Sequence, residues 1–356
     1  MKAFYKILLS IIILQTMACA DLSYYMHSAQ GQMSIMQKMQ DIDNVMQDES
    51  TQATLKQQLK LVGSIRQFAF DELRLPESDS YTQYADLGRP YVLKNLFASD
   101  EFSISLQIWC YPVVGCAGYR GYFDEKKLEE FKSTLLLQGK DVYVANIPAC
   151  STLGWFDDPV LNTFISWPGY RLAGLIFHEL AHQRLYIDDD SQFNESFAMA
   201  VQYSGVEKWL QNKGQFEKLK RYKQYQQNRL KVIRLIEQGR SNLTRMYEQN
   251  LDDNEKRLQK KQLLAQLKAD YEMLSSEFEV PDGFKYLFKG ELNNAKLASV
   301  STYLSRVKAF RKLLQSHAGN YAEFYLHVND IGKLPVEERK SCLDQWGQTE
   351  TGPVNC

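Results

Sequence analysis

Residues 171–182 read RLAGLIFHELAH, an apolar run of helical composition that ends in two histidines four positions apart. On a helix, this spacing puts His178 and His182 on one face, one turn apart, so that both imidazoles can bind one zinc ion. Glu179 lies beside the first histidine, and in motifs of this kind it transfers protons and does not bind metal. The stretch therefore predicts a helix with a catalytic metal site. The alternative is a helix whose histidines are only polar surface groups.

Two neighbouring helices are predicted around this motif. Pro168 suits a first helical position, so the first helix is expected over 168–186. The polar turn LYIDDDSQ follows at 185–192, and a second helix is expected from about 192 to 212. A catalytic zinc needs a third protein ligand and an open fourth position. Glu195, near the start of the second helix, is the candidate for that ligand.

This arrangement resembles the gluzincin peptidases, the thermolysin-like class, in which a glutamate on the following helix completes the site. In many such sites a carboxylate one turn later orients a histidine. Met199 occupies that place here and cannot do so, which leaves the aspartates at 188, 189 and 190 as candidates. The alternative for Glu195 is a carboxylate placed near a helix N-terminus because the helix dipole favours it there.

The first residues have the pattern of an export signal. Lys2 and Lys6 precede an apolar run at 7–15, which is short for a bilayer span and is followed by small residues. Residues 1–18 are therefore predicted to be a signal peptide, with residues 19–356 as the mature body. Cys19 follows at the position of a lipid-modified cysteine, with ordinary cleavage as the alternative. We expect a lipid-anchored protein of the bacterial cell envelope on the periplasmic side, at the outer membrane because Ala20 follows Cys19.

Composition and cysteine content narrow the class of protein. The 356 residues carry a formal net charge of −1, which gives no reason to expect a nucleic-acid partner. Beyond Cys19 there are five cysteines, so some could pair in an oxidising compartment while at least one stays free or pairs elsewhere. Cys342 and Cys356 could close a C-terminal loop. No pair has the spacing of a cysteine zinc site.

The rest of the chain predicts a mainly helical α+β fold with a small sheet. Residues 21–75 have helical periodicity. Strands are expected over 102–111 and 141–147, with a helix between them over 124–138 that begins at Asp124 as its N-cap.

Residues 215–275 are a long charged tract that predicts an inserted helical hairpin. The LDDN stretch at 251–254 would turn it back. A solvated basic face explains its charges, and an arm that binds a partner or a membrane surface is the alternative.

Four segments spread along the chain resemble one family, the predicted zinc aminopeptidases of bacteria, which are usually lipoproteins. They occur in the family's order around the metal motif. These segments are CADLSYYMHSAQGQMSIM at 19–36, the block from Arg89 to Asp124, STLGWFDDPVL at 151–161 and LNNAKLASVSTYLSRVKAF at 292–310. The resemblance implies a zincin-like metallopeptidase with one Zn²⁺ and a peptide substrate.

The same segments suggest further site residues. Peptide hydrolysis creates an oxyanion that needs a donor, and Tyr303 is the first candidate for it, with His327 second. Asn293 and Asn294 could hydrogen-bond a substrate backbone or could cap a helix. Arg120 could bind a substrate carboxylate or form a structural ion pair. Ordinary packing is the alternative for Tyr303 and His327.

Together these features predict a zinc-dependent peptidase, an aminopeptidase by resemblance, in which Glu179 activates a water molecule on zinc. Two other functions remain open from the sequence. One is a zinc amidase that acts on cell-wall material, and the other is a non-catalytic envelope lipoprotein with structural zinc. The choice between exo- and endopeptidase, the substrate sequence and the oligomeric state are open as well.

Overall fold

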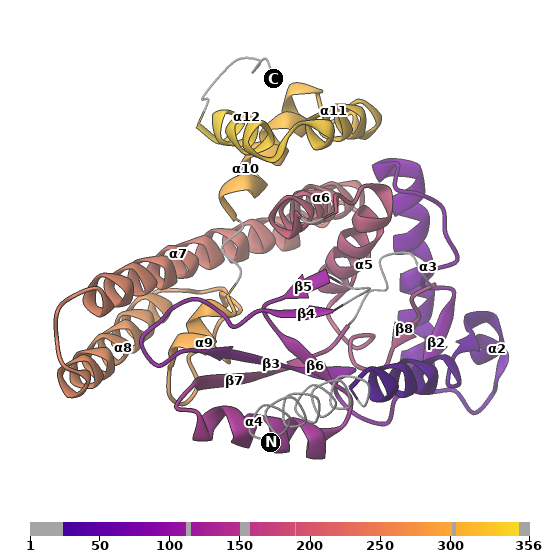
Figure 1. Ribbon diagram of the computed structural model, residues 1–356. Helices are drawn as coiled ribbons and strands as arrows, with labels where there is room; N and C mark the ends of the chain where they lie inside the picture. Colours follow the sequence, from indigo (N-terminus) through magenta and orange to yellow (C-terminus); the bar gives the residue numbers. More distant parts are fainter. Residues whose placement is uncertain (1–23, 112–114, 150–156, 189, 301–303, 349–356) are drawn as a thin grey trace, which may run out of the picture.

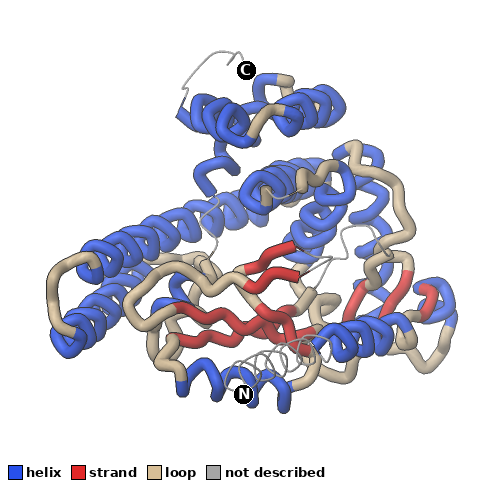
Figure 2. Tube along the Cα trace, viewed as in Figure 1, coloured by secondary structure: helices blue, strands red, loops and turns tan. Residues whose placement is uncertain are grey.

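Helices form most of the part of the chain that the computed structural model describes, which comprises residues 24–111, 115–149, 157–188, 190–300 and 304–348 (Figure 1, Figure 2). Residues 24–36 are helical. The labelled helices are α2 (Ile42–Gln47), α3 (Ala53–Leu73), α4 (Glu125–Leu137), α5 (Gly169–Arg184), α6 (Ser191–Asn212), α7 (Phe216–Tyr247), α8 (Asp253–Ser276), α9 (Asn294–Ala298), α10 (Leu304–Ser316), α11 (Tyr321–Lys333) and α12 (Val336–Gln348). The prediction of a mainly helical α+β protein is confirmed.

The strands of the described residues form three small sheets. The strands are β1 (Gln40–Asp41), β2 (Gln83–Ala85), β3 (Leu93–Ser99), β4 (Trp109–Tyr111), β5 (Gly115–Ala117), β6 (Arg120–Tyr122), β7 (Asp141–Ile147) and β8 (Val160–Leu161). The sheet that matters for the site has the order β6–β3–β7 and is antiparallel. The others are β1–β2–β8 and the hairpin β4–β5.

Helix α4 covers one face of the β6–β3–β7 sheet (Figure 1). Leu96 and Ala98 of β3 pack there with Leu128 and Leu135 of α4 in a small core. Because side chains alternate across a strand, the intervening residues of β3 and β7 face the other way, toward the rest of the protein. The predictions for this region are confirmed at β7 and at α4, where the Asp124 side chain accepts hydrogen bonds from the first amides of the helix.

The main core lies around α5 and α6, which pack side by side. Helix α3 packs against α5, and Figure 1 shows α10, α11 and α12 on the other side of α6. Phe193 and Phe197 of α6 are fully buried, and both rings contact the ring of Phe310 on α10. The metal motif therefore lies on a helix that is covered on most of its circumference.

Helices α7 and α8 form the predicted hairpin, which projects from the body in Figure 1. The chain turns back between Glu248 and Asp252, and Asp252 begins α8 with a capping box completed by Glu255. The predicted turn is confirmed, but it lies at 248–252, a little before the predicted 251–254, because Asp253 and Asn254 already belong to α8.

The strand predicted over 102–111 is wrong for most of its length, since only Trp109–Tyr111 is a strand. In the segment before β4, the Gln107 amide donates a hydrogen bond to the Ala98 carbonyl near the end of β3, but the segment forms no strand there. Phe102, earlier in the same segment, packs against the ring of Tyr247 in α7. The central strand β3 was not predicted. Lys94 and Asn95 interrupt the apolar pattern of this strand, whose remaining residues are mostly apolar.

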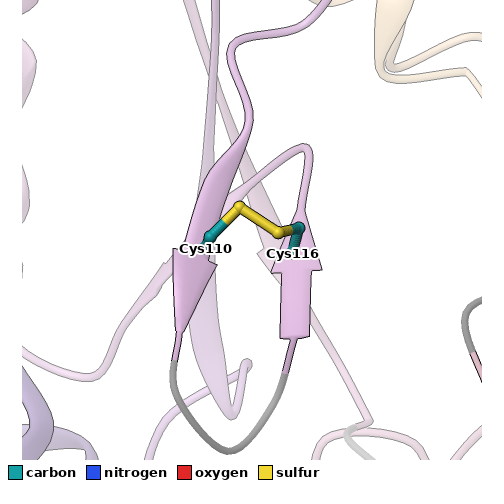
Figure 3. The surroundings of a disulfide bond; sticks show 2 residues. All are labelled: Cys110 and Cys116. Atoms are coloured by element: carbon teal, nitrogen blue, oxygen red, sulfur yellow. A yellow bond between two sulfur atoms is a disulfide. The ribbon is translucent and has the colours of Figure 1, made fainter.

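A disulfide joins Cys110 and Cys116, which are paired across the β4–β5 hairpin (Figure 3). Cys342 is disulfide-bonded as well. The pairing of Cys342 with Cys356, the signal peptide 1–18 and the lipidation of Cys19 lie outside the described residues. Within the described ranges, no helix is both long enough and apolar enough to cross a membrane.

Candidate metal centre

Helix α5 presents the two histidines of the motif. It begins at Gly169, with Pro168 as its N-cap, one residue later than predicted. Leu172, Ile176 and Leu180 bury its other faces. One turn of helix separates the histidines, and their Nε2 atoms are 3.2 Å apart. Both nitrogens therefore face the same point.

Helix α6 brings the third predicted ligand to that point. Glu195 places one carboxylate oxygen 3.4 Å from His178 Nε2 and the other 3.6 Å from His182 Nε2. Asn194 fixes the preceding turn, because its side chain accepts a hydrogen bond from the Ile187 amide and donates one to the Ile187 carbonyl. The triad predicted from the sequence is thus brought together by two helices and a locked turn.

The spacing of these donor atoms fits a metal ion. The three residues form a group of possible metal ligands whose donor atoms lie within 4.8 Å of one another. Two ligands about 2.0–2.1 Å from a tetrahedral zinc lie roughly 3.3 Å apart. The imidazole nitrogens are 3.2 Å apart, and each lies 3.4 or 3.6 Å from a different oxygen of Glu195, distances close to that value. Two imidazoles and one carboxylate also form the donor set of a catalytic zinc site, which keeps its fourth position open.

Burial and neighbouring charges together set the pKa values of the three ligands. Burial lowers the pKa of His182 to about 4, and the neighbouring His178 acts in the same direction. Burial would also lower the pKa of His178, but its hydrogen bond to Glu195 and the charge of Glu179 raise it. Burial raises the pKa of Glu195, but the hydrogen bond and charge of His178 lower it more. His182 is therefore a neutral imidazole, the form that binds metal.

Gln202 is a neighbour of His178 that sequence reasoning missed. Its side chain is close enough to contribute to the raised pKa of His178. Gly174, one turn before His178, leaves the space: a Cβ at that glycine would lie 3.1 Å from Gln202 Nε2. Gln202 follows Glu195 by seven residues, so it lies two turns further along the same face of α6. That spacing is the one signal in the sequence that could have identified it.

The aspartates between the two helices do not take the predicted orienting role where the structure describes them. Asp190 caps α6 by accepting a hydrogen bond from the Phe193 amide, and it forms a buried ion pair with Arg339 at 2.7 Å. Asp188 is exposed, and Asp189 lies outside the described residues. Met199 carries no charge, as expected, and lines a cavity beside the centre.

A turn from the N-terminal part of the chain docks on the metal helix near Glu179. The Ser80 hydroxyl accepts hydrogen bonds from Gln183 Nε2 of α5 at 3.0 Å and from the Asp158 amide at 3.3 Å. Tyr81 follows in a left-handed backbone conformation, with φ of 63°, and is buried. Burial raises the pKa of Tyr81 well above its ordinary value, and the charge of Glu179 adds to this effect. Nothing in the sequence around 80–81 predicted this contact.

A cavity of about 350 Å³ lies between the sheet and the helices. Its walls come from β3, β7, α6, α7 and the segment from Phe284 to Val300. Tyr143, Ala145 and Ile147, alternate residues of β7, all face it, as the strand period requires. Met199, one turn after Glu195, forms the wall nearest the ligands along α6.

The remaining predicted site residues have contacts elsewhere. Arg120 lies over the Tyr24 ring at 4.1 Å and lines a different cavity, beside α4. His327 Nδ1 is 3.1 Å from His317 Nε2 among the C-terminal helices. Tyr303 lies outside the described residues, although Ser299 and Val300 just before it line the cavity.

The two asparagines serve the fold. Asn293 caps α9, the alternative left open from the sequence, and donates a hydrogen bond to the Val142 carbonyl. Asn294 is fully buried, and its side chain accepts a hydrogen bond from the Tyr247 hydroxyl. It also donates hydrogen bonds to the Asp100 and Glu101 carbonyls. Their predicted contacts with substrate, like those of Arg120 and His327, stay predictions.

Comparison with known proteins adds one finding. A family model with the description "Putative aminopeptidase" matches residues 23–343, which include the whole metal centre and the cavity. The chain belongs to this aminopeptidase family. The resemblance to an aminopeptidase family is thereby confirmed. No curated protein and no solved structure matches the chain.

Proposed function

We propose that this member of the aminopeptidase family is a zinc-dependent peptidase that removes residues from the N-terminus of peptides. The observation that carries the proposal is the spacing of the donor atoms of His178, His182 and Glu195, which come from two helices and suit a tetrahedral site. Family membership supports peptide hydrolysis independently of that geometry.

The chain's own residues divide the chemistry between them. A zinc ion held by His178, His182 and Glu195 would acidify a water molecule and polarise the peptide carbonyl. Glu179 would take a proton from the attacking water and later donate it to the leaving amine. Its side chain is half-buried and its charge raises the pKa of His178, which supports this role. Three protein donors leave one position for water or substrate.

The cavity beside the triad supports catalysis over a structural role for the metal. A structural zinc site is closed by four protein ligands. Among the described residues, the group of possible ligands has three members, and a space of about 350 Å³ begins one turn away along α6. We propose a zincin-like fold on the same two observations.

We further propose that Cys19 carries a lipid that holds the enzyme at the bacterial outer membrane, facing the periplasm. The pattern of residues 1–20 supports this placement, and the Cys110–Cys116 disulfide is of a kind that persists in oxidising compartments. A Cys19→Ser variant should move from the membrane fraction to the soluble fraction. Its continued sedimentation with membranes would contradict the lipid anchor.

Digestion of a peptide library tests the catalytic proposal. We expect the zinc-loaded protein to release N-terminal residues, and Glu179→Gln to reduce the rate by about 100-fold or more. Zinc content measured by elemental analysis should stay near one per chain in that variant, because Glu179 is not a ligand. Glu237→Gln, a change at an exposed position of α7, serves as the matched control. Cleavage by Glu179→Gln at the full wild-type rate would contradict the proposed mechanism. Cuts within the peptides, away from their N-termini, would show an endopeptidase instead of an aminopeptidase.

A further inference from the structure

The cavity beside the metal centre contains an arginine. Arg229 of α7 is the one charged side chain among the described residues that line it. The other walls are mostly apolar or aromatic, with Met199, Phe97 and Ile147 among them. Burying a charged group in such surroundings costs free energy unless the group pairs with an opposite charge.

The cavity reaches α6 one helical turn beyond a proposed metal ligand. Met199 follows Glu195 by one turn on the same face of α6, about 6 Å along the helix. A space of about 350 Å³ extends from there to Arg229. A cavity of this volume is roughly 9 Å across, which corresponds to two or three residues of extended peptide.

Arg229 is held in place without a carboxylate. Its guanidinium lies 4.5 Å from the centre of the Phe284 ring, and it lies near the Tyr203 hydroxyl, where its charge lowers the pKa of the tyrosine against the larger effect of burial. Gly283 lies beside this group with φ of 87°, and a Cβ there would lie 3.0 Å from the Tyr225 hydroxyl, a tight contact, and 3.4 Å from Arg229 Nη1.

Two other arginines show the contrast. Arg311 pairs with Glu207 at 2.9 Å, and Arg339 pairs with Asp190 at 2.7 Å. In the described part of the chain, Arg229 has no carboxylate within the 4 Å of an ion pair, although it is half-buried. Its neighbours therefore fix the side chain and leave its hydrogen-bond donors for a group from outside the protein.

We propose that Arg229 binds a carboxylate of the peptide substrate, either an acidic side chain or the free C-terminus of a short peptide. A guanidinium matches a carboxylate with two parallel hydrogen bonds, and low-dielectric walls strengthen that contact. This inference rests on the proposed peptidase function and names the class of substrate for it. The preferred substrates are small acidic peptides, or peptides that end within two or three residues of the cleaved bond.

Matched peptides separate the two sources of the carboxylate. Leu-Ala-Ala as the free acid and as the C-terminal amide tests the terminus. Leu-Ala-Glu-amide and Leu-Ala-Gln-amide test the side chain. We expect at least one acid to exceed its neutral partner by about tenfold or more in kcat/KM, the effect of one charge-assisted contact.

Variants assign the preference to Arg229. Arg229→Met should bring the ratio of acid to neutral peptide close to one, whereas Arg229→Lys should keep part of it because a point charge remains. Arg234→Met, at an exposed position of the same helix, should leave the ratio as in the wild type. Melting temperatures of all variants would show whether each is folded.

A binding measurement keeps this inference separate from the proposed function. Calorimetric titration of zinc-loaded Glu179→Gln protein with the same peptides should show tighter binding of an acid, and adding Arg229→Met should remove the difference. If no peptide is cleaved by the wild type, the peptidase proposal fails while the titration still decides the role of Arg229. Equal binding and equal rates for both peptide pairs in the wild-type protein would overturn the carboxylate site. So would a preference that persists in Arg229→Met.

Discussion

The metal centre and the cavity beside it are built in different ways. The centre uses residues 178–195, two helices and one turn, so all its ligands lie within a short stretch of chain. The cavity uses β3, β7, α6, α7 and the segment before α10, which are distant in sequence. The first can be recognised from residue spacing alone. The second exists only after the sheet has packed against the helices, and it is the part that would select a substrate.

Substitution of a metal ligand should have the largest effect, a loss of zinc affinity that substitutions in the cavity wall do not cause. Glu195→Gln keeps the size of the side chain but removes its charge, so zinc affinity should fall by at least about 100-fold. Zinc that binds only the folded state raises the melting temperature of the wild type, and this gain should disappear in the variant. Competition with a chelator of known affinity measures the first quantity, and differential scanning fluorimetry the second.

Met199→Leu is the matched control, because it changes the cavity wall one turn away on the same helix and no ligand. It should retain its zinc. A protein with Glu195→Gln that binds zinc as tightly as the wild type would show that the carboxylate is not a ligand and that its position near the helix N-terminus explains it.

A smaller loss of zinc affinity is expected when Gln202, the neighbour of His178, is substituted. Gln202→Leu removes the amide beside His178 while filling much of its volume, so zinc affinity should fall by about 10- to 100-fold. The free energy of unfolding of the metal-free protein should change little, because the histidine is already held by packing. Unaltered chelator competition in Gln202→Leu, with a normal melting temperature, would remove Gln202 from the centre.

These two regions also show what the sequence can and cannot predict. The triad, the helix capped by Asp124 and the α7–α8 hairpin follow from spacing, capping and periodicity, which are local properties. The strand predicted over 102–111 failed because apolar alternation does not reveal whether a neighbouring strand accepts the pairing.

The contacts that support the site were missed for a related reason. Ser80 meets Gln183, and Gln202 fills the space left by Gly174, through packing between separate elements. Arg229 reads in sequence as one of many cations on a charged helix. Only the position of Phe284 and Tyr203 around it distinguishes it from Arg234 on the exposed side.

The smallest predicted effect on substrate preference concerns Gly283, the glycine next to Tyr225 and Arg229. Gly283→Ala places a Cβ 3.0 Å from the Tyr225 hydroxyl and 3.4 Å from Arg229 Nη1, so Tyr225 must move beside Arg229, and the preference for an acidic peptide should fall by about threefold. Gly290→Ala is the matched control, since that glycine also has positive φ, 76°, but nothing lies within 4 Å of the added atom. Both substitutions should cost about 1 kcal/mol of stability from the left-handed backbone, measured by urea unfolding. Only Gly283→Ala should alter the ratio of acid to neutral peptide, and an equal loss in both variants would mean that backbone strain, not the position of Arg229, controls it.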